Sequence, residues 1–126
     1  MKQKKLEALT NFTLPFEIES ESLKAYKDYS NGFSNSSVRL IKGIICDALK
    51  KGENLTEAGK YVTDEIGKKE GGSYLCIFYK NNYGAGGCYD CKIKSLALQF
   101  TRDDVDYEIF VAKICHGNCK ANNCIR

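Results

Sequence analysis

The sequence predicts an α+β fold in which two helices pack on an antiparallel β-sheet. Apolar residues first recur at three- and four-residue spacing between Val38 and Ile66, which is the period of amphipathic helices. After Gly71 and Gly72 the pattern changes to alternation and short apolar runs, which are typical of strands. Helices that precede a series of strands favour an α+β domain, so we expect the strands to form an antiparallel meander.

The first helix is expected over residues 37–51. Asn35, Ser36 or Ser37 can each cap its N-terminus, and Gly52 is a residue type that commonly ends a helix. Its core-facing stripe consists of Val38, Ile41, Ile44, Ile45, Ala48 and Leu49.

The second helix is expected to begin after Asn54. Asn54 and Glu57 have the spacing of a capping box, and Gly71 and Gly72 follow the last turn. Its core-facing residues are Ala58, Tyr61, Val62 and Ile66.

Five strands are expected, one before these helices and four after them. The segment Tyr74–Tyr79 is apolar on both faces, which predicts a central strand that is covered on both sides. A glycine- and asparagine-rich turn follows it, and Arg102, Asp103 and Asp104 predict a hairpin turn. The other strands are expected at residues 16–19, 88–93, 96–100 and 107–114.

The length of 126 residues fits one domain with two flanking segments. Residues 1–36 are expected to form a polar N-terminal extension, residues 37–114 the folded domain, and residues 115–126 a cysteine-rich tail. Tyr26, Tyr29 and Phe33 could dock the extension onto the domain or onto a partner.

Charge and composition argue against nucleic acid and membrane as partners. The net charge is +3, and the lysines are scattered among acidic residues instead of forming a basic block. No apolar run is long enough for a membrane span, and the basic N-terminus is not followed by the apolar region of a signal peptide. We therefore expect an intracellular protein, or a mature form whose leader has been removed, and mostly reduced cysteines.

Seven cysteines leave a metal site open as an alternative. A zinc ion could use Cys88, Cys91 and Cys115, with Cys119 or His116 as the fourth ligand. The first two cysteines lie on an expected strand and the tail spacing is irregular, so we predict reduced thiols and no metal or cofactor. Cys46 and Cys76 lie among apolar residues and are expected in the core.

No catalytic site is expected. The single histidine, His116, lies in a polar tail beside Gly117 and Asn118, where a solvated side chain is more plausible than a general base. The acidic run at Asp103, Asp104, Asp106 and Glu108 fits a solvated hairpin tip better than a pair of catalytic carboxylates.

One ordered set of residues resembles a known family. A helix end of the form Glu-x-x-Lys-Lys leads to a strand with an aromatic residue, Cys and Ile, and then to Asn, an aromatic residue and Gly. The positions are Glu65, Lys68, Lys69, Tyr74, Cys76, Ile77, Asn82, Tyr83 and Gly84. In this order and spacing they resemble the small dynein light chain family, of the peptide-binding hub type, over about residues 35–114.

The resemblance implies a protein without enzymatic activity that works by β-augmentation. Two protomers would exchange a strand across a two-fold axis, and a disordered partner segment would add as one more strand. The exchanged strand would consist of Ala85, Gly86, Gly87, Cys88, Tyr89 and Asp90. The peptide-binding groove would be formed by Leu55, Thr56, Lys80, Asn81, Tyr83, Gly84, Cys88 and Tyr89, with Leu96 and Leu98 on its floor.

Three departures from the family pattern concern this groove. The chain enters the expected exchanged strand through Gly84-Ala85-Gly86-Gly87, and glycine residues weaken a strand. Leu55 and Thr56 stand where a charged pair is usual, and a Leu-Ala-Leu segment replaces an aromatic-rich strand. We therefore expect a partner sequence that differs from the family's usual motif, and a homodimer or a heterodimer with a related light chain.

The implied partners are dynein intermediate or heavy chains and other light chains of a microtubule motor. The implied location is the cytoplasm and cytoskeleton, in particular the axoneme of a cilium. The alternative from a different class is a cysteine-rich secreted or zinc-binding small α+β module. A count of free thiols under native conditions would separate the two hypotheses.

Overall fold

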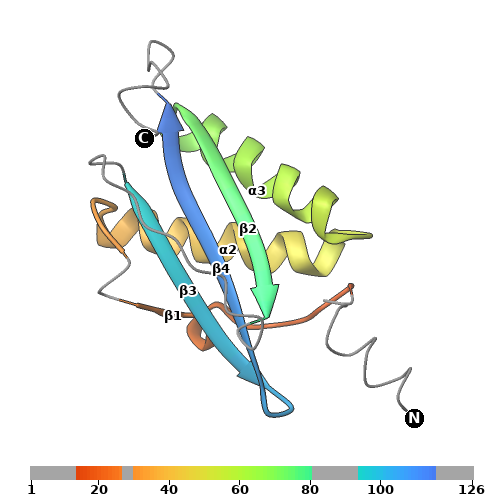
Figure 1. Ribbon diagram of the computed structural model, residues 1–126. Helices are drawn as coiled ribbons and strands as arrows, with labels where there is room; N and C mark the ends of the chain where they lie inside the picture. The colour runs from red at the N-terminus through yellow and green to blue at the C-terminus, as the bar shows by residue number, and fades with distance from the viewer. Residues whose placement is uncertain (1–13, 27–29, 81–93, 116–126) are drawn as a thin grey trace.

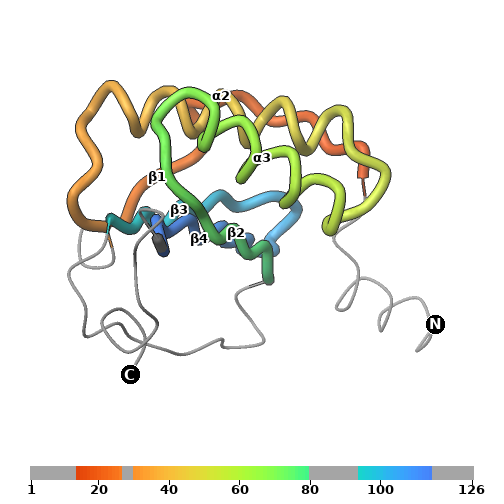
Figure 2. Tube along the Cα trace, turned by 90° about the horizontal axis from the view of Figure 1, so that it is seen from above, coloured from red at the N-terminus to blue at the C-terminus, as the bar shows by residue number. Residues whose placement is uncertain are grey.

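The computed structural model describes residues 14–26, 30–80 and 94–115, and these form two layers (Figures 1 and 2). Helices α2 and α3 lie together on one face of a four-stranded antiparallel sheet, which confirms the predicted α+β class. The elements in chain order are the short 3-10 helix η1 (Ser20–Ser22), β1 (Lys24–Ala25), α2 (Asn35–Lys51), α3 (Leu55–Glu70), β2 (Ser73–Lys80), β3 (Ser95–Arg102) and β4 (Val105–Cys115).

Both helices begin at side-chain caps. The Ser34 hydroxyl accepts a hydrogen bond of 3.1 Å from the backbone N–H of Ser37, so α2 begins two residues earlier than predicted. The Asn54 side chain accepts one of 2.9 Å from the N–H of Glu57, which confirms the predicted cap of α3. Gly71, with φ of 76°, ends α3 in a backbone conformation that favours glycine.

The sheet has the order β1-β3-β4-β2. β3 and β4 form a hairpin whose two turn residues, Asp103 and Asp104, have φ of 53° and 64°. Positive φ at both positions identifies a type I′ turn, whose twist matches that of the flanking strands. The predicted hairpin turn is confirmed.

Two strand predictions were wrong. No strand forms at residues 16–19, because the Phe16 N–H donates to the carbonyl of Leu49 and the chain follows the end of α2; the first strand is β1 instead. Among the described strands β2 has one neighbour, β4, so it lies at an edge of the described sheet, where a central strand was predicted. The predicted strand at residues 88–93 lies outside the described residues.

The hydrophobic core lies between the sheet and the two helices. Two of its members, Phe16 and Leu23, come from the segment before α2, and Leu23 has no exposed surface. The other buried members are Ile41, Ile44, Ile45, Ala48, Leu49, Ala58, Val62, Ile66, Tyr74, Leu96, Leu98, Phe100, Ile109 and Val111.

Strand alternation places a second set of side chains on the opposite face of the sheet, which we call the far face. It is defined by residues that alternate with core members on the three long strands. They are Leu75, Ile77 and Tyr79 of β2, Ser95, Ala97, Gln99 and Thr101 of β3, and Asp106, Glu108, Phe110, Ala112 and Ile114 of β4. Figure 2 shows that α2 and α3 both lie on the other side.

Candidate functional site

The long edge of β2 is the main candidate for an interaction site. β2 spans eight residues and pairs along its whole length with β4. Its other side has no neighbour in the described sheet. A long edge strand is a template for pairing with another chain, because backbone N–H and C=O groups along it alternate outward.

The opposite edge of the sheet is closed over most of its length. β1 pairs with Leu98 and Gln99 of β3, and the Tyr26 N–H donates to the Ala97 carbonyl over 2.9 Å. Asn31 and Ser95 then exchange two backbone hydrogen bonds of 2.8 Å. The two edges of the described sheet therefore differ: of its four strands, only β2 presents a long run of backbone to a partner strand.

The far face beside this edge is mostly apolar. Ile77 is 43% exposed, the only large hydrophobic side chain of that exposure within the described ranges. Cross-strand pairing arranges the face in three rows from β2 to β4 to β3. The rows are Leu75–Ala112–Ser95, Ile77–Phe110–Ala97 and Tyr79–Glu108–Gln99.

The third row is polar, and at its β3 end Gln99 pairs with Lys24 of β1. The Tyr79 hydroxyl hydrogen-bonds to Glu108, and the Tyr26 hydroxyl donates to the side-chain oxygen of Gln99. Burial, followed by the bond to Glu108 and that carboxylate's charge, raises the pKa of Tyr79 to about 12. The phenol therefore stays protonated and donates to Glu108 at neutral pH.

The structure places four of the predicted groove side chains. Leu55 is half-buried and packs against the core, and Thr56 is exposed beside it in the first turn of α3. Leu96 and Leu98 are buried between the sheet and the helices, so neither is open to a ligand.

The predicted floor residues thus lie on the face that the helices cover and not on the far face. A shift of one residue along a strand moves a side chain to the other face of the sheet. Ala97 and Gln99 occupy the far-face positions of the same strand. Their alternation with Leu96 and Leu98 is the signal in the sequence that could have identified them.

Other predicted residues cannot be compared with the structure. Lys80 is the last residue of β2. The remaining groove and exchanged-strand residues lie outside the described residues and stay predictions: Asn81, Tyr83, Gly84, Ala85, Gly86, Gly87, Cys88, Tyr89 and Asp90. The same holds for Cys91, His116 and Cys119 of the zinc alternative.

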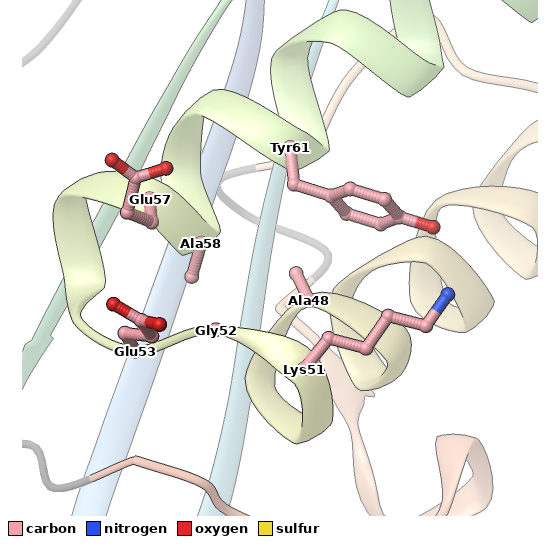
Figure 3. Close-up of a pocket in the computed structure, with 7 residues that line it drawn as sticks. All are labelled: Ala48, Lys51, Gly52, Glu53, Glu57, Ala58 and Tyr61. Atoms are coloured by element: carbon pink, nitrogen blue, oxygen red, sulfur yellow. The ribbon is translucent and has the colours of Figure 1, made fainter.

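A shallow depression of about 450 Å³ lies where α2 turns into α3 (Figure 3). The Lys51 ammonium is 5.4 Å from the centre of the Tyr61 ring, and Glu53 and Glu57 lie on the rim. Both carboxylates are exposed to solvent. The depression is a surface feature of the helical turn.

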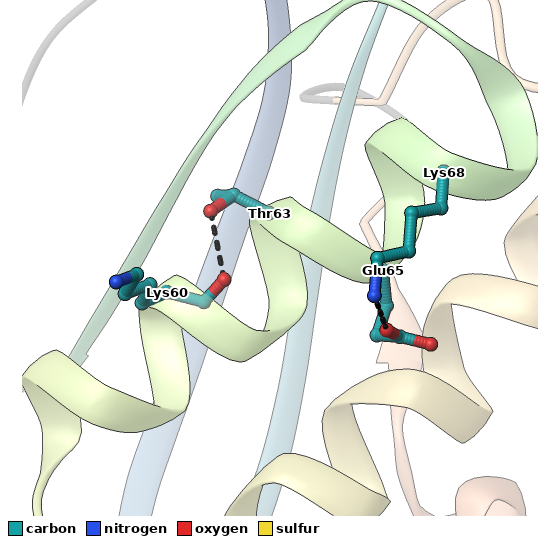
Figure 4. Close-up of polar contacts among 4 residues, drawn as sticks. All are labelled: Lys60, Thr63, Glu65 and Lys68. Atoms are coloured by element: carbon teal, nitrogen blue, oxygen red, sulfur yellow. Dashed lines mark hydrogen bonds and ion pairs between the residues drawn. The ribbon is translucent and has the colours of Figure 1, made fainter.

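Two local polar contacts lie on α3 (Figure 4). Thr63 donates to the carbonyl of Lys60 over 3.1 Å. Lys68 and Glu65 form an ion pair of 3.2 Å with i,i+3 spacing. Glu65 and Lys68 belong to the Glu-x-x-Lys-Lys pattern, so here this pattern stabilises the end of the helix.

Cys46 and Cys76, which were predicted in the core, are partly buried and pack against it. Burial raises the pKa of Cys76 to about 12, and burial followed by the charge of Asp47 raises that of Cys46. Neither thiol forms appreciable thiolate at neutral pH. Within the ranges that the structure describes, no three His, Cys, Asp or Glu side chains gather as a metal site would require.

Comparisons with known proteins assign the chain to no family. No protein-family model matches the chain, and no curated protein sequence matches it. No helix in the described part of the chain is long and apolar enough to cross a membrane.

Proposed function

We propose that this chain is a non-catalytic dynein light chain that dimerises and binds dynein intermediate or heavy chain segments by β-strand addition. The observation that carries the proposal is the edge strand β2, with Ile77 exposed on its far face. Backbone hydrogen bonds along this edge would supply affinity, and side chains of the far face would supply sequence preference.

The two-faced character of β2 supports this proposal. Tyr74 faces the helices and is buried, whereas Leu75 and Ile77 face away from them. Burial of apolar surface on either face contributes a favourable free energy of about 25 cal/mol per Å² of surface removed from water. The helices cover one face of β2, so a second protomer or a partner segment on the other face would add to the stability of the assembly.

The family resemblance supplies the identity of the partner. Three of the residues that carry the resemblance lie on β2, namely Tyr74, Cys76 and Ile77. Two more lie at the end of the preceding helix, Glu65 and Lys68. The resemblance implies two helices on a sheet, and α2 and α3 have that arrangement. The proposed setting is a microtubule motor, in the cytoskeleton and in particular the axoneme, with no cofactor.

The proposal can be tested with purified protein and with its native cell. Sedimentation equilibrium under reducing conditions is expected to give a dimer. Affinity isolation of the tagged chain is expected to recover dynein intermediate or heavy chains together with other light chains. A monomer at high concentration, combined with an isolate that lacks every dynein subunit, would refute the proposal.

A variant of the far face shows whether β2 is the surface that is used. Ile77→Glu is expected to weaken dimerisation and dynein recovery at least tenfold, because it places a charge where an apolar contact is needed. Lys60→Gln is the matched control: it lowers the net charge by the same amount at an exposed position on α3. Circular dichroism must show both variants folded. Equal dimerisation and dynein recovery by both variants would exclude β2 as the binding surface.

A further inference from the structure

The outer side of β3 is covered by part of the chain's own N-terminal segment, which we call the strap. The strap consists of Lys24, Ala25, Tyr26, Ser30 and Asn31. Figure 1 shows β1, the first part of the strap, beside β3 and on the side away from β4. The strap therefore occupies the place that an added strand would take on this side of β3.

The backbone hydrogen bonds of β3 alternate between its two sides. Ser95 and Ala97 donate from their backbone N–H groups to the strap, over 2.8 Å and 3.1 Å. Leu96 and Leu98 alternate with them, so their N–H groups are directed to β4. Each side of β3 thus has its own amide groups, and these report on the strap and on β4 separately.

The strap is held less firmly than β4. β1 contains two residues, both exposed, whereas β3 pairs with β4 over its whole length of eight residues. The N–H of Ala97 donates to the hydroxyl of Ser30, a side-chain acceptor, where a regular ladder uses a backbone carbonyl. Gly32, directly after the strap, has φ of 89° and can act as a hinge.

An apolar anchor lies at each end of the strap. Leu23, directly before β1, has no exposed surface. Phe33, directly after Gly32, packs against the core and stacks on Tyr74 with 6.5 Å between the ring centres. Between two anchored ends, a weakly held segment can open locally without unfolding of the whole domain.

We propose that the strap is an autoinhibitory cover of β3. It detaches while Leu23 and Phe33 stay anchored, and the uncovered edge of β3 then binds an extended segment of a partner chain. The Tyr26 hydroxyl donates to the side-chain oxygen of Gln99, so the partner segment should carry a tyrosine at the same place. This inference goes beyond the proposed function, because it concerns the edge of the described sheet opposite β2.

Hydrogen exchange of the full-length chain, measured by NMR and corrected for intrinsic rates, tests the opening. The amides of Ser95 and Ala97 are expected to exchange at least about tenfold faster than those of Leu96 and Leu98, because the strap opens more often than the domain unfolds. Equal protection of the four amides would overturn the inference, since the strap would then open only together with the β3–β4 pairing.

Tyr26→Pro tests whether the uncovered edge binds a partner segment. This change removes the N–H that donates to the Ala97 carbonyl over 2.9 Å and the hydroxyl that donates to Gln99. Ala25→Pro is the matched control, because alternation directs the N–H of Ala25 away from β3. Circular dichroism must show both variants folded. If Tyr26→Pro does not fold, Ser30→Ala takes its place, because it removes the acceptor of the Ala97 N–H.

The probe is the peptide Lys-Ala-Tyr-Lys-Asp-Tyr-Ser-Asn, which has the sequence of residues 24–31. At millimolar concentration it is expected to shift the amide signals of Ser95 and Ala97 at least about threefold more in Tyr26→Pro than in the wild type or Ala25→Pro, where the strap competes for the edge. Equal shifts in the three proteins, no shifts in any of them, or shifts confined to β2 would overturn the inference.

Discussion

The backbone N–H of Phe16 donates a hydrogen bond of 2.8 Å to the carbonyl of Leu49, in the last turn of α2. The Phe16 ring then lies edge-on to Phe100 and Tyr107, at 5.4 Å and 5.6 Å between ring centres. The Arg102 guanidinium is 4.3 Å from the centre of the same ring. This one residue joins the N-terminal segment to a helix end and to the β3–β4 hairpin.

Removal of the Phe16 ring should therefore destabilise the whole domain. Phe16→Ala is expected to lower the free energy of unfolding by about 3 kcal/mol, measured by urea titration. Ile18→Ala, at a half-buried position of the same segment, is the control and should cost clearly less. If the loss at Phe16 does not exceed that at Ile18, the segment is not part of the cooperative unit.

The hairpin turn offers a stabilising substitution. Asp103 and Asp104 both have positive φ, which costs energy for residues with a Cβ atom. Asp104→Gly is expected to raise the free energy of unfolding by about 0.5–1 kcal/mol, because Asp-Gly suits a type I′ turn. Asp106→Gly, within β4, should instead lower it. A gain from both substitutions would argue that the effect is one of charge.

The cap of α3 provides a third prediction. Asn54→Ala removes the acceptor of the Glu57 N–H and is expected to cost about 1 kcal/mol in urea unfolding. Thr56→Ala changes an exposed neighbour that takes no part in this bond. A loss at Asn54 no larger than that at Thr56 would show that the cap bond does not stabilise the helix in solution.

The helices and the hairpin could be predicted because their determinants are local. The cap at Asn54, the glycines after α3 and the Asp103–Asp104 turn each act within a few residues. The position of β2 could not be predicted in the same way, because apolar residues on both faces occur in central strands and also in edge strands that meet another chain. The strand order, which depends on long-range pairing, decides between them.

The candidate site was predictable only in part for a related reason. Leu96 and Leu98 are apolar, and the sequence does not state which face of the sheet the helices cover. The face is set by the pairing of β3 with β4 and by the packing of both on α2. Ala97 and Gln99 were missed because small and polar residues give a weak sequence signal for a binding surface.

Ionisation of Tyr79 should lower the free energy of unfolding at alkaline pH. Its pKa of about 12 in the folded protein lies above the usual value near 10, so the folded state favours the protonated phenol. This contribution is complete below about pH 10 and is lost as the pH rises through about 12. Tyr79→Phe should lose less stability than the wild type between about pH 10 and 12.

Glu108→Gln tests the assigned cause of that shift. Removal of the carboxylate charge is expected to lower the pKa of Tyr79, and the ultraviolet difference spectrum of the phenolate should appear at lower pH. An unchanged titration in Glu108→Gln would leave burial as the only cause.

Cys76 should resist alkylation in the native protein. Its thiol packs against the core and its raised pKa leaves little thiolate at about pH 8. Mass spectrometry of peptides after N-ethylmaleimide treatment is expected to show labelling at least about a hundredfold slower than in concentrated urea. Equal rates in buffer and urea would mean that β2 opens readily.

The unequal edges of the sheet limit how many chains can assemble. Tyr26 and Asn31 occupy backbone groups on the outer side of β3, whereas β2 has no neighbour in the described sheet. Within the part of the chain that the structure describes, each molecule thus offers one long edge for strand pairing. A strand that adds along β2, from a second protomer or from a partner segment, occupies that long edge. The fold thus combines one exposed strand edge with protection against fibre formation, since the opposite edge of the described sheet offers only a short run of backbone to propagate a polymer.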